Sequence, residues 1–225
     1  MNMTIKEIYD TFDKIGCLTF ATINEAGYPE TRIAHLRGYD EQGVYFMTMT
    51  SKPFYKQLVD TGKISICGMS ASTEVTELED GNLYFEPGYT ARLTGDVIEI
   101  DMPEIKEKAK KNSLFEYCVK DQERYPTMVT FCITKFAGEI FKYDFEKKNM
   151  DHKVLRTRFS YGNFLSKPAG LTIKGNCIKC GRCHDECTFD AIHEIEVQYQ
   201  INGSKCDECG SCFLVCPTGA ISIRE

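Results

Sequence analysis

Two stretches, CIKCGRCHDEC at residues 177–187 and CDECGSCFLVC at residues 206–216, decide the fold of the C-terminal part of the chain. Each has the cysteine spacing C-x2-C-x2-C-x3-C. Thiolates spaced in this way converge on one cluster when the backbone turns tightly between them, and Gly181 and Gly210 lie inside these turns, where the missing Cβ lets the backbone approach metal. The spacing predicts iron–sulfur ligation by eight cysteines: Cys177, Cys180, Cys183, Cys187, Cys206, Cys209, Cys212 and Cys216.

Two other uses of cysteine compete for these motifs. Disulfide frameworks are typical of small secreted domains, and zinc ribbons use pairs of C-x2-C motifs. Neither requires three cysteines at this spacing followed by a fourth, twice over. The pattern therefore favours iron over disulfides or zinc.

Residues 169–225 resemble the bacterial ferredoxin domain with two 4Fe-4S clusters, including the ending CPTGAI at residues 216–221. The resemblance implies crossed ligation, in which each cluster takes its fourth thiolate from the other motif. One cluster would be held by Cys177, Cys180, Cys183 and Cys216, and the second by Cys206, Cys209, Cys212 and Cys187. The first motif departs from the family pattern at Thr188, where a proline usually follows the fourth cysteine.

Length and charge limit the other possibilities. The chain has 225 residues, which leaves about 168 for a second domain and a linker. A formal net charge of −6 argues against binding nucleic acid through phosphate neutralisation. The first residues do not form a basic segment followed by an apolar core, and no apolar run reaches about 18 residues. We expect a cytoplasmic protein with neither a nucleic-acid nor a membrane partner.

Hydrophobic periodicity before residue 148 predicts a strand-rich domain. A helix is expected between the capping pair Thr4 and Glu7 and a stop at Gly16, and another from Ser51, as the N-cap, to Leu58. Strands are expected at residues 17–23, 30–37, 44–48, 63–69, 83–86, 89–100, 128–134 and 139–143. Helical segments are expected after Asp101 and over 114–119. The pattern favours an α+β protein whose N-terminal part is an antiparallel barrel with helices at its ends.

A phosphate-bearing cofactor would need an unusual binding segment, because no G-x-G-x-x-G follows a strand and no Walker sequence occurs. Between Thr48 and Lys52, hydroxyl groups and an ammonium group meet the expected start of a helix, which suits an anion. A cation beside a helix cap is more often part of a solvated surface. This segment alone leaves both interpretations open.

Residues 1–148 resemble the FMN-binding split barrel of the pyridoxamine 5'-phosphate oxidase-like superfamily. The resemblance rests on LTFATINEAGYP at residues 18–29, the strand from Arg32 to Arg37, residues 44–52 and Lys56-Gln57-Leu58. It implies bound FMN and a homodimer with two FMN sites at the subunit interface. The expected parts are an FMN-binding split barrel over 1–148, a linker over 149–168 and the two-cluster ferredoxin domain over 169–225.

The same resemblance implies which residues contact the flavin. Arg32, Ile33, Ala34 and His35 would line the isoalloxazine and phosphate, Thr50, Ser51 and Lys52 would grip the phosphate, and Thr48 and Thr90 would add polar contacts. His35 also fits an ordinary core or surface histidine. Pyridoxamine phosphate oxidases use a C-terminal segment containing Trp and Arg, whereas this chain has no tryptophan. Oxidation of vitamin B6 is therefore not expected.

Other residues have ordinary explanations. Four isolated cysteines, Cys17, Cys67, Cys118 and Cys132, are expected to be small buried apolar side chains. Basic residues from Lys147 to Arg158 are expected to form a solvated linker, although residues 156–162 could instead pack against the flavin edge or a partner barrel.

The two cofactors together indicate a redox function. A cluster moves one electron at a time, whereas a flavin accepts one or two. We expect an FMN- and iron–sulfur-dependent oxidoreductase that passes electrons between the clusters and FMN, and on to a small molecule or a redox protein. The alternative is a non-enzymatic electron-transfer protein that only docks with redox partners.

Overall fold

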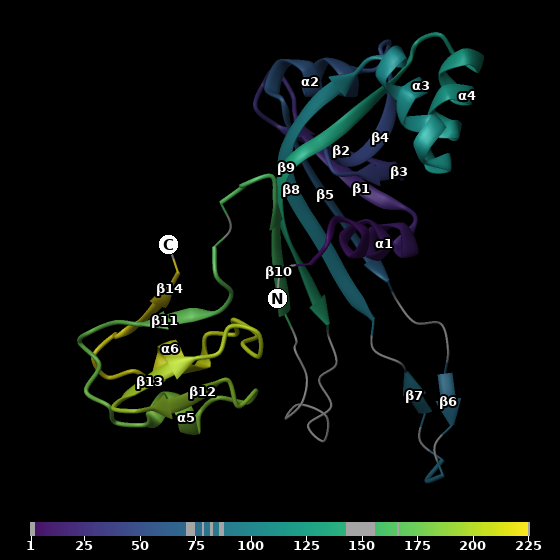
Figure 1. Ribbon diagram of the computed structural model, residues 1–225. Coiled ribbons are helices and arrows are strands. Elements are labelled where there is room, and N and C mark those ends of the chain that lie inside the picture. The colour runs from purple at the N-terminus through teal and green to yellow at the C-terminus, as the bar shows by residue number, and fades with distance from the viewer. Residues whose placement is uncertain are drawn as a thin grey trace. The chain divides into compact units, whose positions relative to one another are not determined.

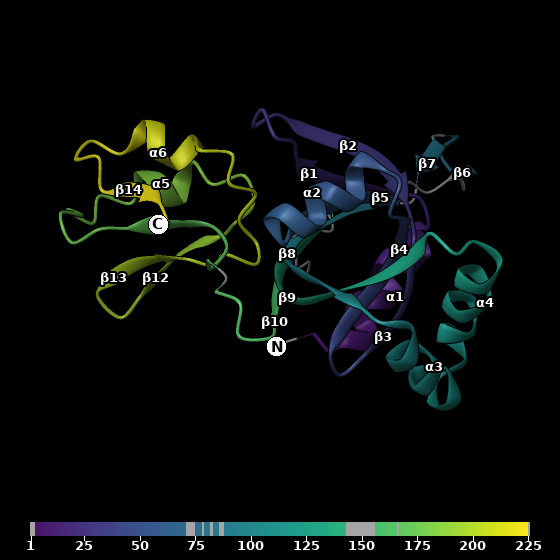
Figure 2. The ribbon, with the colours of Figure 1, turned by 90° about the horizontal axis from the view of Figure 1, so that it is seen from above.

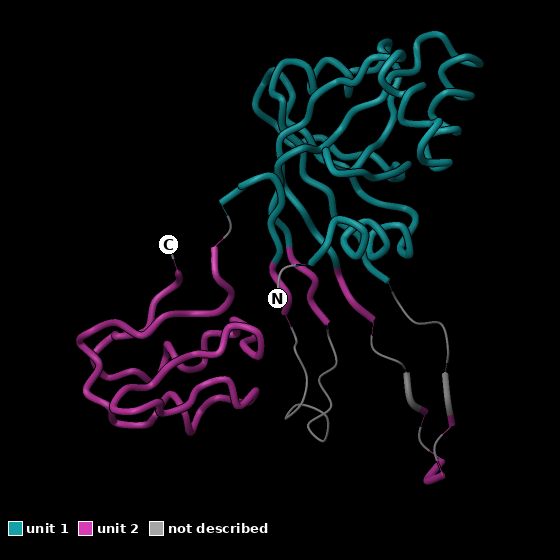
Figure 3. The backbone as a smooth tube through the Cα atoms, in the orientation of Figure 1, with its two compact units in different colours: residues 1–70, 91–138, 159–166 teal, residues 71–90, 139–158, 167–225 magenta. Residues whose placement is uncertain are grey.

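The computed structural model describes residues 3–70, 75–77, 79–81, 83–85, 88–142, 156–165 and 167–224. The chain forms two compact units (Figure 3). Unit 1 comprises residues 1–70, 91–138 and 159–166, and unit 2 comprises residues 71–90, 139–158 and 167–225. Each unit is therefore made of three separate stretches of the sequence.

Unit 1 is built on an eight-stranded antiparallel sheet that curls into a half-barrel (Figures 1 and 2). The strand order is β2-β1-β5-β8-β9-β4-β3, and β10 pairs with β9. The strands are β1 (Leu18–Ile23), β2 (Pro29–Ala34), β3 (Leu36–Asp40), β4 (Gly43–Met49), β5 (Lys63–Ser70), β8 (Tyr89–Ile100), β9 (Met128–Lys142) and β10 (Arg156–Tyr161). The α+β class with an antiparallel split barrel, expected from the sequence, is confirmed.

Aromatic side chains fill the inside of the curled sheet. Phe20, Phe46 and Phe131 are buried, and the Phe46 ring stacks on Phe131 with centroids 5.7 Å apart. Phe54 contributes a ring from the helix that follows β4. The alternation of buried and partly exposed residues along β1 follows the two-residue period of a strand. This core fixes which face of each strand points inward.

Four α-helices surround this sheet. They are α1 (Ile5–Ile15), α2 (Pro53–Thr61), α3 (Met102–Lys111) and α4 (Glu116–Arg124), with a 3-10 turn at Ser113–Phe115. Helix α1 begins with the predicted capping box of Thr4 and Glu7 and ends at Gly16. The predicted cap of α2 is wrong, because Lys52 occupies the N-cap position and no side chain caps the helix. Pro53 supplies the first turn instead, since its missing N–H leaves one donor fewer to satisfy.

Three strand predictions need correction. The expected strand over 30–37 is divided into β2 and β3, whereas the strands expected at 128–134 and 139–143 form the single strand β9. Strand β10 lies where a linker was expected. The close approach of Phe159, on β10, to β9 requires a glycine at position 138. A Cβ on Gly138 would lie 2.3 Å from the Arg92 carbonyl oxygen and 2.4 Å from the Phe159 ring.

Unit 2 contains the cysteine motifs in two similar halves. Its elements are β11 (Leu171–Ile173), α5 (Arg182–Asp185), β12 (Ile192–Ile195), β13 (Gln198–Ile201), α6 (Ser211–Val215) and β14 (Ile221–Ile223). Strand β11 pairs with β14 and β12 with β13, both antiparallel. The unit also includes a hairpin of β6 (Val75–Glu77) and β7 (Leu83–Phe85). Among the described residues, no helix is both long enough and apolar enough to cross a bilayer.

Candidate functional site

Cysteines from both motifs surround one cavity in unit 2. Cys177, Cys180 and Cys183 of the first motif line it together with Cys216 of the second. Apolar side chains such as Ile173 and Ile221 complete the lining. The structure thus brings together the four cysteines predicted to hold one cluster. Cys187, the remaining cysteine of the first motif, is not among the residues that line this cavity.

Of the other four cysteines, Cys206 and Cys212 belong to one buried cluster, and Cys187 packs against it. Burial raises the pKa of Cys212 to about 11, and the charges of Cys206, Cys187 and Cys209 contribute to this rise. Burial also raises the pKa of Cys206, where Cys187 again adds repulsion. These thiols repel one another as thiolates because they lie close together in an apolar environment. A bound cation would reverse this effect, since metal ligation favours the deprotonated thiol.

Backbone N–H groups point at the sulfur atoms in both halves. Lys179 N lies 3.4 Å from Cys177 Sγ, and Glu208 N lies 3.4 Å from Cys206 Sγ. Both donors belong to residues with positive φ, 56° for Lys179 and 62° for Glu208. A left-handed backbone at these positions aims the amide back at the preceding cysteine, as in other anion-binding turns.

A second pair of amides serves the fourth cysteine of each motif. Ala191 N lies 3.3 Å from Cys187 Sγ, and Ala220 N lies 3.2 Å from Cys216 Sγ. Burial opposes the thiolate at Cys216, but backbone hydrogen bonds from Ala220 and Thr218 overcome it and lower the pKa. Hydrogen bonds of this kind favour a thiolate ligand. The donor set of eight sulfurs, with amides directed at them, therefore fits two iron–sulfur cubanes.

A buried charge network contacts the second motif, and sequence reasoning missed it. Arg156 from β10 pairs with Glu139 from β9, and their side chains are 8% and 6% exposed. The same guanidinium donates to two backbone carbonyls, Nε to Cys206 O at 3.4 Å and Nη2 to Asp207 O at 3.2 Å. The expected solvated linker is therefore wrong for Arg156. The local sequence around Arg156 does not reveal that its side chain is buried. A buried arginine differs from a surface arginine in the residues that pair with it, and these are distant in the sequence.

Arg158 completes the network two residues along the same strand. Its Nε donates to Glu139 Oε2 at 2.8 Å, and its Nη2 to Glu208 Oε1 at 2.9 Å. Glu208 in turn accepts the Gly170 amide at 2.8 Å. Two arginines and two glutamates thus hold the Cys206–Cys209 turn to the ends of β9 and β10 within unit 2. Lys147, Lys148 and Lys153 of the predicted basic linker lie outside the described residues.

The residues predicted for the flavin isoalloxazine lie on both faces of β2. Arg32 points inward, where Nη1 donates to Thr22 Oγ1 at 2.6 Å and its guanidinium lies 4.2 Å from the Phe54 ring centroid. Ile33 points to the other face and is 64% exposed. Ala34 follows the inward alternation of Arg32, and His35 lies just beyond the strand with Nδ1 2.9 Å from the Gly16 carbonyl oxygen. Arg32 and Ile33 project from opposite faces of β2. A flavin ring lying on one face of the strand therefore cannot contact both side chains of the same chain.

The residues predicted for the phosphate lie between β4 and α2. Thr50, Ser51 and Lys52 are exposed, directly before the first turn of α2. The Thr50 amide donates to Thr127 O at 2.8 Å and the Lys52 amide to Met49 O at 3.0 Å, so these two donors serve the fold. The two hydroxyls and the ammonium are a donor set that fits a phosphate beside a helix N-terminus. Thr48 is buried, and Thr90 lies in unit 2.

The isolated cysteines divide into two pairs. Cys118 and Cys132 are buried, as predicted, and burial raises the pKa of Cys118 to about 11 and that of Cys132 to about 12. The prediction is wrong for Cys17 and Cys67, which are exposed. Cys67 pairs with Thr19 on the outward face of β5, a face that periodicity alone could not assign.

Comparison with known proteins agrees with the geometry of unit 2. Residues 176–221 match the 4Fe-4S dicluster domain family. A ferredoxin of Alicyclobacillus acidocaldarius subsp. acidocaldarius is 43% identical over 57 residues, which cover 24% of this chain and 73% of that protein. One component of an ion-translocating oxidoreductase complex from Methanosarcina acetivorans is 42% identical over 48 residues, 21% of this chain, but only 18% of that protein is covered.

A solved structure resembles the larger part of the chain. A NimC/NimA family protein from Clostridium acetobutylicum has a TM-score of 0.49 and 22% identity, covering 69% of this chain and 91% of that one. A likeness at this level says nothing about ligand or activity. The match to the ferredoxin is stronger, because it covers 73% of that protein at 43% identity. The residues matched by the dicluster family include both cysteine motifs. Through residues 176–221 the chain belongs to the 4Fe-4S dicluster ferredoxin family.

Proposed function

We propose that the protein is an oxidoreductase that binds FMN in unit 1 and passes electrons between this flavin and the two clusters of unit 2. The observation that carries the proposal is the occurrence in one chain of a complete dicluster domain and a curled antiparallel sheet with an anion-suited donor set before α2. When bound, the clusters supply one-electron transfer and the flavin supplies exchange between one- and two-electron chemistry.

The residues of the chain have distinct tasks in this proposal. Lys52, Thr50 and Ser51 bind the flavin phosphate at the start of α2. Arg32 is held by Thr22 and Gln57, with Nη2 2.9 Å from Gln57 Oε1, so its guanidinium has a fixed position beside Phe54. In unit 2, the amides of Lys179 and Glu208 orient sulfur ligands, while Arg156 and Arg158 hold the turn after Cys206.

The proposed assembly is a homodimer, supported by an apolar outward face of unit 1. Ile33 and Met69 are exposed on β2 and β5. The register places Ile33 and Cys67 on either side of Thr19, so these side chains share one face of adjacent strands. Exposed apolar side chains grouped on one face of a sheet are typical of a protein interface. A second copy of the chain would cover them, and the outward Ile33 would then reach the partner's side of the interface.

The test of the proposal is cofactor content followed by turnover. Protein purified without oxygen is expected to contain one FMN per chain, with about eight iron and eight sulfide. Steady-state oxidation or reduction of a small molecule would then separate an enzyme from a carrier that only exchanges electrons with protein partners. Protein that retains iron and sulfide but binds no flavin after incubation with FMN would refute the flavin proposal and leave the cluster assignment intact.

A further inference from the structure

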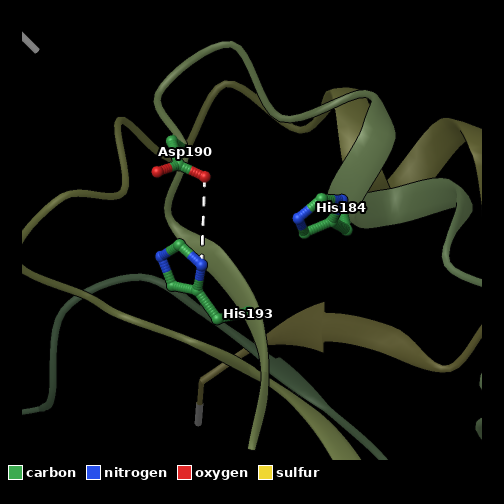
Figure 4. A group of neighbouring side chains, drawn as sticks. All are labelled: His184, Asp190 and His193. Carbon is green, nitrogen blue, oxygen red and sulfur yellow. Dashed lines mark ion pairs between the residues drawn. The ribbon is translucent and has the colours of Figure 1, made fainter. Parts of the chain in front are cut away.

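Three side chains that take no part in the cysteine sets meet on the surface of unit 2. His184 lies on α5, His193 on β12, and Asp190 in the turn before β12 (Figure 4). One potential ligand atom from each residue lies within 4.8 Å of the other two. His193 Nδ1 is 3.9 Å from Asp190 Oδ1, and the two imidazole rings have centroids 6.4 Å apart.

The chemistry of this group suits a divalent transition metal. Two imidazoles and a carboxylate form the ligand set of many zinc sites that keep an open position for water. All three side chains are accessible from solvent, with exposed fractions of 46% for His184, 55% for Asp190 and 43% for His193. An ion could therefore enter without any opening of the fold.

His184 also has a partner of the kind that supports a metal ligand. Its Nδ1 lies 3.1 Å from Asp185 Oδ1. In metal sites, a carboxylate on one ring nitrogen fixes the ring orientation and the tautomer and leaves the other nitrogen for the metal. Asp185 is thus already placed to orient the His184 imidazole for a metal.

The position of the group relative to Cys187 gives it a structural consequence. The Cys187 amide donates to His184 O at 3.0 Å, and the Cys187 carbonyl accepts from the Asp190 amide at 3.2 Å. A metal joining the side chains of His184 and Asp190 would therefore close a bridge across the cysteine that both residues already hold. Such a bridge restricts the segment because it fixes both of its ends.

The second half of unit 2 has no such group at the corresponding positions. Counted from the first cysteine of each motif, His184, Asp190 and His193 correspond to Phe213, Gly219 and Ser222. The same count places Thr188 opposite Pro217. Proline restrains the turn after the fourth cysteine in the second half by fixing φ, whereas threonine does not do so in the first. The metal ligands thus occur only in the half that lacks this proline.

We propose that His184, Asp190 and His193 bind one divalent transition metal of the Zn²⁺ type, which braces the turn that carries Cys187. The metal is additional to the iron of the clusters and uses no cysteine. Its binding does not depend on the proposed flavin function, because all of its ligands lie in unit 2.

The test is titration of anaerobic holoprotein, clusters intact, with Zn²⁺ by calorimetry. We expect one Zn²⁺ per chain, and a loss of affinity of at least tenfold in His184→Ala and in His193→Ala. Glu194→Gln is the matched control, because Glu194 is an exposed carboxylate on the same strand but outside the group. Iron content of each variant shows whether the clusters are retained, and saturating Zn²⁺ should raise the thermal midpoint of the wild type but not of His193→Ala.

Zinc X-ray absorption separates this site from exchange into the cysteines. Nitrogen and oxygen ligands at about 2.0–2.1 Å are expected, whereas sulfur at about 2.3 Å would place zinc at the cluster cysteines and overturn the proposal. Absence of binding to the wild type, or equal affinity in the wild type and both histidine variants, would overturn it as well.

Discussion

Arg156 donates from Nε to the backbone carbonyl of Cys206, 3.4 Å away, while its Nη1 pairs with the buried carboxylate of Glu139. Within unit 2, β10 is thus tied to a ligand of the second motif by a charged group with little access to water. The buried position makes each member of the pair costly to remove alone.

Removal of Arg156 is expected to destabilise unit 2. Arg156→Met keeps most of the side-chain volume but leaves the buried Glu139 with Arg158 as its remaining ion-pair partner. Complete loss of a buried pair typically costs about 3–5 kcal/mol, so a loss below this range is expected. Glu139→Gln in the same chain should recover part of the loss, because it removes the incompletely paired charge. Chemical denaturation followed by cluster absorbance measures both, with Arg124→Met, an exposed arginine, as the control. Equal stability of Arg156→Met and Arg124→Met would contradict the role of the network.

The same substitution should also change one cluster potential more than the other. Loss of a positive charge disfavours addition of an electron to a nearby cluster, so the potential of the cluster bound by Cys206, Cys209 and Cys212 should fall by on the order of tens of millivolts. Redox titration followed by electron paramagnetic resonance resolves the two clusters. Identical shifts in both would mean that Arg156 acts on the whole unit rather than on the turn after Cys206.

Crossed ligation gives opposite predictions for two cysteines. Cys216→Ala should remove the cluster of the first motif, because Cys216 lines the cavity with Cys177, Cys180 and Cys183. Cys187→Ala should remove the other cluster, because Cys187 packs against the buried group that contains Cys206 and Cys212. Iron should fall from about eight to about four per chain in each variant. If spectra show that each variant instead loses the cluster of its own motif, ligation is not crossed.

The cluster ligands could be predicted from the sequence, whereas the buried contacts of Arg156 and Glu139 beside them could not. Cysteine spacing is a local property, so the segments Cys177 to Cys187 and Cys206 to Cys216 indicate their chemistry without a structure. Arg156 and Glu139 are 17 residues apart, and Arg156 and Cys206 are 50 apart. Nothing in the local pattern around residue 156 indicates such distant partners, which is why the sequence predicts a solvated linker there.

The sheet shows the same division between local and distant information. Period-two alternation located β8 at residues 89–100 as predicted, but the break between β2 and β3 falls at His35, where no glycine or proline marks it. Alternation also predicts two faces for β2 without saying which is inside. For this reason the sequence could not separate the inward Arg32 from the outward Ile33 within one predicted flavin segment.

The phosphate assignment predicts a difference between two ligands. Lys52→Ala removes a charge-assisted contact typically worth about 1.5–3 kcal/mol, so FMN affinity should fall roughly ten- to a hundredfold. Riboflavin, which has no phosphate, should lose little. Lys56→Ala is the matched control, because Lys56 lies on α2 and already pairs with Glu25 and Asp60. Equal losses for FMN and riboflavin in Lys52→Ala would place the phosphate elsewhere.

The proposed dimer can be tested through its apolar face. Ile33→Lys together with Met69→Lys places two charges among exposed apolar side chains of β2 and β5, which should prevent a second copy from covering them. Light scattering should give twice the mass of one chain for the wild type and the mass of one chain for the variant. Val59→Lys with Tyr117→Lys, exposed apolar positions on α2 and α4, serves as the control. A wild-type protein that is monomeric at all concentrations would contradict the homodimer.

The central claim is that the flavin and the clusters exchange electrons within the assembled protein, and rapid mixing tests it most directly. Anaerobic holoprotein is mixed with a one-electron donor that reduces the clusters, and cluster and flavin absorbance are followed together. We predict that flavin reduction follows cluster reduction and is lost in the Cys187→Ala, Cys216→Ala double variant, which still binds FMN. Flavin that stays oxidised while the clusters are reduced, although a free mediator can reduce it, would contradict the account.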